Sequence, residues 1–491
     1  MTPDRVSTGI PGVDTILNGG LIDGRNALLR GPPGSGKTIF SLYFLSAGVD
    51  AGETSLFVNL GEPSDYVNRT ASAFDLHADD VHFVDLSPTD EQFSPDEAYT
   101  LFEGAAVEQP DYITALRETI EDIDPDRILL DPITEFRFLT TDERQFRKQI
   151  LGFLDFLSAR DMTVVLTSQA TSSIPDDDLQ FLTDTVINLE LHSDYRTVRV
   201  SKFRGSSYRS GSHAYEIDDS GVTVFPKIRG DLEPVDHVEL TKLSSGVPEL
   251  DQLLNGGLSR GTVTALSGPT GAGKTTTGVQ FLKEAVAQGE RAVLYEFEES
   301  TRTLLDRARA INIPIEPMVE RGDLSVVEVP PDAYTVDEFG HMVRTAVEEA
   351  GVDVVMIDGT KGFGQNLRGM DDDPARDLLR IGRYLRSQGV TVIVPHEVHS
   401  VTGEFKVTER GTSNLADTIL FIRHVEYHGE IRKVIGALKM RTSSFERALR
   451  ELEITEYGLQ VGDPLPHLRG ILTGTPGWND REQTLDANNG A

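Results

Sequence analysis

Two glycine-rich stretches, "GPPGSGKT" at residues 31–38 and "GPTGAGKT" at residues 268–275, decide the fold of this chain. Both match the pattern G-x-x-x-x-G-K-[ST], in which backbone N–H groups converge on phosphate oxygens, the lysine reaches the outer phosphates and the hydroxyl holds Mg²⁺. An apolar run precedes each stretch and a helical pattern follows it, which is the context that this motif requires. A single match is compatible with a chance glycine-rich turn, but two matches in phase argue strongly against it.

We therefore predict that each stretch binds the phosphates of ATP or GTP together with Mg²⁺. The predicted nucleotide-binding residues are Gly31, Pro32, Pro33, Gly34, Ser35, Gly36, Lys37 and Thr38 in the first stretch and Gly268, Pro269, Thr270, Gly271, Ala272, Gly273, Lys274 and Thr275 in the second.

The rest of the chain repeats in the same phase, which indicates a duplication. The same number of positions separates Lys37 from Lys274 and Lys202 from Lys439. The paired segments are "STGIPGVDTILNGGL" (7–21) with "SSGVPELDQLLNGGL" (244–258), "LLRGPPGSGKT" (28–38) with "ALSGPTGAGKT" (265–275), and "VSKFRGSS" (200–207) with "ALKMRTSS" (437–444).

Each copy shows the alternation of an α/β domain. Short apolar runs such as "SLFVNL" and "AVLYEF" alternate with longer helical patterns, which predicts a mostly parallel central sheet flanked by helices. The later runs "TVRVSKFRG" and "GVTVFP" predict an antiparallel hairpin added at the sheet edge. We place the two domains at residues 1–233 and 238–475 and expect a polar, disordered tail over 476–491.

The composition is that of an acidic protein without cysteine chemistry. The 491 residues are too many for one core, and neither a membrane-spanning apolar stretch nor a signal-peptide pattern is present, so we expect a cytoplasmic protein. The absence of cysteine excludes disulfides, cysteine nucleophiles and zinc fingers. A net charge of −33, spread along the chain, indicates a surface adapted to high salt and weighs against binding to nucleic-acid backbones.

An aspartate ends the third apolar run of each copy. Asp131 closes "DRILLD" and Asp358 closes "DVVMID". A carboxylate at the carboxyl end of a buried strand faces the crevice where ligands bind in open α/β sheets, and in phosphate-loop enzymes it holds Mg²⁺. With Thr38 and Thr275, these aspartates are the predicted metal residues. The alternative is an ordinary aspartate that begins a loop or caps a helix.

Carboxylates also follow the second apolar run. In the second copy "VLYEFEES" ends on Glu298 and Glu299, whereas "LFVNLGEPS" in the first copy has Gly61 and Glu62. We expect this strand to lie beside the strand that leads into the phosphate loop, so that a carboxylate at its tip accepts a proton from an attacking water or hydroxyl. Glu62, Glu298 and Glu299 are therefore predicted catalytic residues. The alternative is an exposed acidic turn before a helix.

A Lys-x-Arg pair recurs late in each copy. Lys202 and Arg204, and likewise Lys439 and Arg441, lie two positions apart on a predicted strand, so both cations share one face. Because nothing in the neighbourhood of either glycine loop provides an arginine for the γ-phosphate, we predict that these pairs act on the nucleotide of a neighbouring subunit, as an arginine finger does. The alternative is a solvated strand face.

Together these segments resemble the KaiC family of duplicated RecA-superfamily ATPases and autokinases, which includes cyanobacterial clock proteins and archaeal and bacterial relatives. The resemblance reaches about Thr475 and rests on "GVDTILNGGL", both glycine loops, "EFEES", "VVMID", "DTILFIRHVEYHGE", "KFRGSS" and "ALKMRTSS". It implies two tandem RecA-like domains in a homo-hexameric ring of two stacked tiers. In such a ring ATP lies between subunits, the Lys-x-Arg strand contacts the neighbour's phosphates, and paired glutamates serve as the base. With the acidic composition, it points to a haloarchaeal member.

The chain departs from the family pattern at three places. Gly61 stands where the family has the first glutamate of the pair. The family's autophosphorylated serine–threonine pair lies just ahead of a D-T-I, and counting back from "DTI" gives Ser413 and Asn414 here. The resemblance therefore implies Ser413, or the adjacent Thr412, as phosphoacceptor. Where the family has threonines after the following strand, this chain has Pro395, His396 and Glu397.

From the motifs and the resemblance we predict an ATPase with Mg·ATP in both halves, slow hydrolysis, serine/threonine autokinase activity in the second half, and a role in signalling. Two alternatives stay open. One is a ring-shaped scaffold whose ATP occupancy gates partner binding and whose turnover is incidental. The other is a DNA recombinase or helicase, against which the acidic balance and the lack of a basic loop cluster argue.

Overall fold

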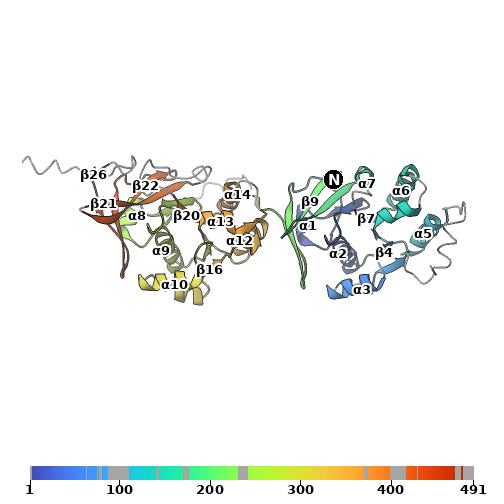
Figure 1. The fold of residues 1–491 in the computed structure, drawn as a ribbon, viewed down its shortest axis with the longest axis horizontal. Coiled ribbons are helices and arrows are strands. Elements are labelled where there is room, and N and C mark those ends of the chain that lie inside the picture. The colour runs from blue at the N-terminus through green and yellow to red at the C-terminus, as the bar shows by residue number, and fades with distance from the viewer. Residues whose placement is uncertain are drawn as a thin grey trace, which may run out of the picture. The chain divides into compact units, whose positions relative to one another are not determined.

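The chain divides into two compact units, residues 1–227 and 228–491, each built as a sheet with helices against it (Figure 1). The division lies slightly ahead of the predicted domain end at residue 233. The computed structural model describes residues 3–61, 64–74, 76, 80–86, 110–139, 143–169, 176–229, 241–369, 374–398, 416–427, 429–469 and 477–478. Within these ranges, no helix is long and apolar enough to cross a membrane.

The first unit contains these described elements. The strands are β1 (Arg5–Val6), β2 (Leu21–Ile22), β3 (Asn26–Arg30), β4 (Ser55–Asn59), β5 (His82–Asp85), β6 (Arg127–Asp131), β7 (Thr163–Ser168), β8 (Thr185–Leu191), β9 (Arg196–Phe203), β10 (His213–Asp218) and β11 (Gly221–Phe225). The helices are α1 (Pro11–Ile16), α2 (Lys37–Asp50), α3 (Ser64–Ala73), α5 (Pro110–Ile123), the 3₁₀ helix η2 (Ile133–Leu139), α6 (Glu143–Ser158) and α7 (Asp177–Leu182).

The second unit repeats this series with small additions. The strands are β12 (Lys242–Leu243), β13 (Leu258–Ser259), β14 (Val263–Gly268), β15 (Ala292–Glu296), β16 (Leu324–Glu328), β17 (Tyr334–Thr335), β18 (Val354–Asp358), β19 (Leu367–Arg368), β20 (Thr391–Glu397), β21 (Thr418–Tyr427), β22 (Glu430–Met440), β23 (Arg450–Thr455), β24 (Gly458–Pro464), β25 (Leu468–Arg469) and β26 (Gly477–Trp478). The helices are α8 (Pro248–Leu253), α9 (Lys274–Ala287), α10 (Thr301–Ala310), α11 (Glu316–Glu320), α12 (Val336–Glu348), α13 (Thr360–Asn366) and α14 (Pro374–Ser387).

The end of the chain is described at two residues of the predicted tail. Gly477 and Trp478 form β26, which pairs antiparallel with β25. These two residues are therefore strand-paired rather than disordered, and the rest of the segment 476–491 lies outside the described residues.

Nine of the described strands of each unit form one large sheet, and the two large sheets have the same order; the remaining described strands form two-stranded sheets. That order is β11-β10-β9-β8-β3-β7-β6-β4-β5 in the first unit and β24-β23-β22-β21-β14-β20-β18-β15-β16 in the second. The six neighbouring strands β5, β4, β6, β7, β3 and β8 pair in parallel, and β9, β10 and β11 continue the sheet beyond β8 by antiparallel pairing. The second sheet follows the same scheme. This confirms the predicted class of two tandem RecA-like α/β domains.

The predicted position of the glutamate-bearing strand is wrong. β7 and β6 lie between β3 and β4, and β20 and β18 lie between β14 and β15. Strand order depends on pairing between distant segments, which hydrophobic periodicity does not encode. Because all these strands run parallel, their carboxyl ends still meet at one edge of the sheet, where ligands bind in open α/β folds. The tip of β4 or β15 therefore reaches the ligand edge without being a direct neighbour of the loop strand.

Alternate residues of the central strands pack on opposite faces of each sheet, as the two-residue period of a strand requires. In β6, Leu129 packs with residues of α1, α2 and α3, whereas Ile128 and Leu130 pack with residues of α5 and α6. In the second unit one face packs with α8, α9 and α10 and the other with α12, α13 and α14. The middle of a strand buried on both faces is apolar at successive positions, which explains uninterrupted runs such as "ILL" at residues 128–130.

The antiparallel strands at the sheet edge pack against the phosphate loop. Gly36 and Gly273, which precede α2 and α9, have φ angles of 86° and 105°, a left-handed conformation that favours glycine. A Cβ atom at Gly36 would lie 2.4 Å from Cδ1 of Ile217 in β10, and one at Gly273 would lie 2.6 Å from Cδ1 of Ile454 in β23. The backbone conformation therefore favours glycine at this position, and a Cβ atom there would also have to displace the tip of the isoleucine.

The first loop has an additional contact with the edge strands. Tyr215 in β10, which is 2 % exposed, donates its hydroxyl hydrogen to the backbone carbonyl of Ser35 at 2.6 Å. Its ring packs edge-to-face against Phe40 in α2. The matching residue of β23 is Leu452, which has no hydroxyl, so the second loop cannot be held in this way.

The substitution Tyr215→Phe tests this contact. Loss of a buried hydrogen bond that leaves its acceptor unpaired costs about 1–3 kcal/mol, so we expect the amides of residues 34–38 to exchange hydrogen about tenfold faster. Hydrogen exchange followed by mass spectrometry measures this, and the loop at residues 268–275 is the internal control. Equal exchange in the variant and the parent, or an equal change in both loops, would refute a local role for the Tyr215 hydroxyl.

Candidate functional site

The carboxyl ends of the parallel strands of the second unit enclose a cavity of about 190 Å³. It lies where the loop after β14, the turn after β15 and the ends of β18 and β20 meet. The predicted residues that line it are Thr270, Gly271, Lys274, Thr275, Glu298, Glu299 and Asp358. The structure thus brings the phosphate loop, the strand-end aspartate and both glutamates of this half together.

In the first unit the loop and the aspartate also meet. The Thr38 hydroxyl donates to Oδ2 of Asp131 at 2.7 Å, and the Thr167 hydroxyl of β7 donates to Oδ1. Burial raises the pKa of the Asp131 carboxyl, while both hydroxyls and the charge of Lys37 lower it. Both oxygens of this carboxylate therefore have a donor. Glu62, the predicted base of this half, lies outside the described residues.

Each loop lysine folds back on its own loop. Lys37 donates to two loop carbonyl oxygens at 3.0 and 3.1 Å, and Lys274 donates to the carbonyl of Pro269 at 3.0 Å. Burial lowers the pKa of Lys274, against three nearby carboxylates that raise it. These carbonyls take the place that phosphate oxygens would have as acceptors, so each ammonium group already lies over its loop.

A third carboxylate, Glu296, lies in the second site and was not predicted. It is the last residue of β15, is 2 % exposed and lines the cavity. Its Oε1 accepts hydrogen bonds from the backbone N–H groups of Glu298 and Glu299, at 3.4 and 3.2 Å. Burial, and then the neighbouring Asp358, raise the pKa of Glu296 to about 8. Burial likewise raises the pKa of Asp358 to about 6.

The matching position in the first unit holds a neutral side chain. Asn59, the last residue of β4, accepts from the Gly61 N–H at 3.4 Å and donates to Asp85 at 3.1 Å. The amide thus orders the following turn in the same way as Oε1 of Glu296, without adding a charge. The signal for Glu296 was present in the sequence, because an acid interrupts the apolar run "AVLYEF" where the first copy has asparagine.

The two predicted glutamates of the second unit have different surroundings. Glu299 forms an ion pair of 2.8 Å with Arg307 in α10, another cavity residue that sequence reasoning missed. Glu298 is exposed, and its Oε1 accepts from the Gly362 N–H of α13 at 3.4 Å. Thr70 stands at the matching position of the first copy, so Arg307 gives the second site a cation of its own.

The end of β20 adds a further acid. Glu397 lines the cavity and accepts a hydrogen bond from the Thr270 hydroxyl at 2.5 Å. The corresponding residues of the first copy are Gln169 and Pro33, so this pair occurs in the second loop. It tethers the loop to the neighbouring strand β20.

The Lys-x-Arg pairs do not reach the phosphate loop of their own unit. Lys202 donates to backbone carbonyls that include Gln180 at 2.7 Å, and Arg204 lies 3.4 Å from Asp184. These partners precede β8, so the pair lies at the amino ends of the parallel strands, whereas the loop lies at their carboxyl ends. In the second unit Lys439 donates to Ala416 at 2.7 Å, and Arg441 lies 3.8 Å from Asp417.

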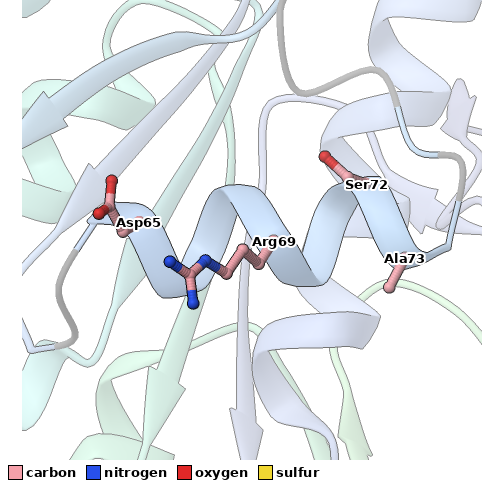
Figure 2. Close-up of a pocket in the computed structure, with 4 residues that line it drawn as sticks. All are labelled: Asp65, Arg69, Ser72 and Ala73. Carbon is pink, nitrogen blue, oxygen red and sulfur yellow. The ribbon is translucent and has the colours of Figure 1, made fainter.

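Ser413 and Thr412, the predicted phosphoacceptors, lie outside the described residues. Within the described ranges, no group of three or more His, Cys, Asp or Glu side chains is arranged to hold a metal ion. The larger hollow of about 540 Å³ is lined by Asp65, Arg69, Ser72 and Ala73, all from α3 (Figure 2). None of these four belongs to a predicted site, so we assign the hollow no role.

Comparison with known proteins agrees with this geometry. The family model described as "ATPase: KaiC" matches residues 6–229 and again residues 243–465. Among curated proteins, the chain is 28 % identical to the circadian clock oscillator protein KaiC of Prochlorococcus marinus (strain MIT 9313), covering 97 % of this chain and 96 % of that protein. It is 27 % identical to the circadian clock protein KaiC3 of Synechocystis sp., covering 96 % and 94 %.

The raised pKa values predict how pH affects the metal-free protein. Glu296 keeps a proton in the folded state at pH values where it loses that proton on unfolding, so its contribution to stability falls as pH rises from about 5 to about 9. Glu296→Gln should therefore gain thermal stability relative to the parent as pH rises, by about 2–4 °C for each kcal/mol.

Thermal unfolding in concentrated salt with a chelator measures this difference. Glu328→Gln is the matched control, since Glu328 ends the adjacent strand β16, pairs in register with Glu296 and is exposed. Melting temperatures of Glu296→Gln and the parent that stay parallel across this pH range would contradict the assignment.

Proposed function

This chain belongs to the KaiC family of ATPases, and from that premise we propose that each half binds Mg·ATP and that the protein hydrolyses ATP slowly. The observation that carries the proposal is the meeting, in each half, of a complete phosphate loop with a buried strand-end aspartate. Asp131 hydrogen-bonds Thr38, and Asp358 hydrogen-bonds Thr275. This threonine–aspartate pair is the arrangement that holds Mg²⁺ beside the phosphates in phosphate-loop enzymes.

The loop residues bind and orient the triphosphate. The N–H groups of the non-proline residues in 31–38 and 268–275 face the phosphate oxygens, and Lys37 or Lys274 exchanges its loop carbonyl acceptors for the outer phosphates. Bound Mg²⁺ would neutralise phosphate charge in the transition state. The residues suited to hold it are Thr38 with Asp131 and Thr275 with Asp358.

Glu299 is the proposed base of the second half. It lines the cavity beside Lys274, and its ion pair with Arg307 orients the carboxylate that would accept a proton from an attacking oxygen. Glu298, on the same turn, is the proposed second member of the pair. Glu62 matches Glu299 by sequence phase and is the proposed base of the first half.

We further propose that the protein assembles as a homo-hexameric ring with ATP between subunits. The supporting observation is the position of the Lys-x-Arg pairs, which lie at the amino ends of the parallel strands, whereas the loop of their own unit lies at the carboxyl ends. Lys202 and Arg204, and Lys439 and Arg441, are therefore placed to act on the phosphates of a neighbour. Such a ring fits a role in signalling, with Ser413 or Thr412 autophosphorylated in the second half.

Two other functions predict different outcomes. An ATP-gated scaffold would bind ATP and assemble but release little phosphate. A DNA recombinase or helicase would bind DNA in the salt that the protein tolerates, and the net charge of −33 disfavours this. Phosphate release and a gel shift, each measured in concentrated salt, separate these functions from the proposed one.

Nucleotide stoichiometry tests the assignment of both sites. Because each lysine serves one loop, Lys37→Ala and Lys274→Ala should each bind about half as much ATP as the parent, and the double variant should bind none. Equilibrium dialysis with labelled ATP in concentrated salt gives the amounts. Full binding in either single variant would count against the loop that it alters.

Incubation with labelled ATP tests the autokinase. We expect label on Ser413 or Thr412, retained in Lys37→Ala and lost in Lys274→Ala. Glu299→Gln should slow labelling about a hundredfold or more, as general-base removal commonly does. Mass spectrometry locates the phosphate. Steady phosphate release from the parent without label on either residue would leave an ATPase and no autokinase.

A further inference from the structure

We propose that the second half holds a divalent cation between two protein carboxylates, Glu296 and Asp358, and does so even without nucleotide. The first half has only one carboxylate at the matching place. The inference deepens the proposed function, since it concerns the same site, and adds Glu296 as a metal ligand specific to the second half.

The first step is the position of the two carboxylates. Glu296 and Asp358 are the last residues of adjacent parallel strands, β15 and β18, and they pair in register. Residues at the same register position project to the same side of the sheet. Both side chains line the cavity together with Thr275. Three oxygen-bearing side chains therefore converge beside the phosphate loop.

The second step concerns the oxygens that lack partners. Glu296 is 2 % exposed and Asp358 is 7 % exposed. Oε2 of Glu296 and Oδ2 of Asp358 are buried, and neither has a hydrogen-bond partner among the described residues. Since Oε1 of Glu296 is held by two backbone N–H groups, the carboxylate is oriented. Buried carboxylate oxygens without a donor are costly, and a cation would satisfy both.

The third step is the contrast with the first half. There the matching residue is Asn59, which is neutral, and both oxygens of Asp131 accept hydroxyl hydrogen bonds, from Thr38 and Thr167. In the second half Pro395 stands where Thr167 does, so Asp358 loses that donor. Two independent sequence differences thus act in the same direction. Glu296 in place of Asn59 adds a carboxylate to the second half, and Pro395 in place of Thr167 removes a donor from its aspartate.

The fourth step is the choice of ligand. Carboxylate and hydroxyl oxygens are hard ligands, which suit Mg²⁺ and Mn²⁺. Two carboxylates neutralise a divalent charge, whereas Asp131 alone would leave it uncompensated until phosphates arrive. The Lys274 ammonium group does not fill the space between the two carboxylates, since it donates to the Pro269 carbonyl. We therefore expect the second half to retain its cation when ATP leaves, and the first half to lose it.

Mn²⁺ binding to the nucleotide-stripped, full-length protein tests the inference. Electron paramagnetic resonance of free Mn²⁺ counts bound ions, and about 1 M KCl, where the screening length is about 3 Å, suppresses binding to the acidic surface. We expect one saturable Mn²⁺ per chain that Mg²⁺ displaces. Glu296→Gln should weaken it at least about tenfold, the lower end of the losses seen when even outer-shell partners of a metal are removed.

Glu328→Gln is the matched control, because it removes the same charge one strand away and should bind Mn²⁺ as the parent does. Asp358→Asn should lose the ion. Should Glu296→Gln fail to fold by circular dichroism, Glu296→Asn, with the residue that the first half has there, replaces it.

The inference fails when the parent binds no saturable Mn²⁺, when Glu296→Gln binds like the parent, or when Glu328→Gln weakens binding as much. Its failure is distinguishable from failure of the proposed function. Binding of labelled ATP by the same preparations, with Mg²⁺ present, is measured separately and depends on Lys37 and Lys274. ATP binding without Mn²⁺ binding would refute the two-carboxylate site alone, whereas absence of ATP binding would refute the proposed function.

Discussion

Each half of the molecule depends on one backbone constraint, namely that a buried strand must turn directly into a helix through a glycine-rich loop, β3 into α2 and β14 into α9. Gly36 and Gly273 satisfy it in the left-handed conformation. They also leave room for Ile217 and Ile454 from the edge strands. The antiparallel edge is therefore part of the phosphate site, because it packs directly beneath the turn that the parallel core presents.

The duplication keeps this framework and changes the chemistry at its edge. In the first half, the hydroxyls of Thr38 and Thr167 hold the buried carboxylate of Asp131. In the second half, Glu296 and Glu397 join Asp358, and Arg307 balances part of the added charge. The backbone N–H groups that Glu296 holds are held in part by Asn59 in the other copy. The same turn is thus ordered by two side chains that both offer an acceptor oxygen but differ in length and charge.

Much of this architecture could be predicted from the sequence, because it depends on local patterns. The glycine loops, the double-sided burial of runs such as "ILL" and the strand-end aspartates all follow from residues within a short segment. The strand order could not be predicted, since β6 and β7 insert between β3 and β4 through pairing of distant segments. For the same reason Glu296 was missed, because its importance comes from Asp358, which lies far along the chain and only becomes adjacent through β15 and β18. Arg307 was missed because its pairing with Glu299 depends on how α10 packs.

The placement of the Lys-x-Arg pairs restricts the symmetry that any assembly using them can have. The phosphate loop lies at the carboxyl ends of the parallel strands, and the Lys-x-Arg cations lie at their amino ends. A subunit that offers its cations to a neighbour therefore turns its own loop away from that neighbour. In a two-fold dimer the same surface patch of each subunit faces its copy, so the loops and the cations, which lie at opposite ends of the strands, cannot both be used. A contact between the cations of one subunit and the loop of the next is heterologous, that is, head to tail. A chain of such subunits has one unpaired loop and one unpaired set of cations at its two ends until the last subunit meets the first. Closure into a cyclic assembly, rather than affinity alone, then determines whether such a protein ends as a finite particle or as a filament.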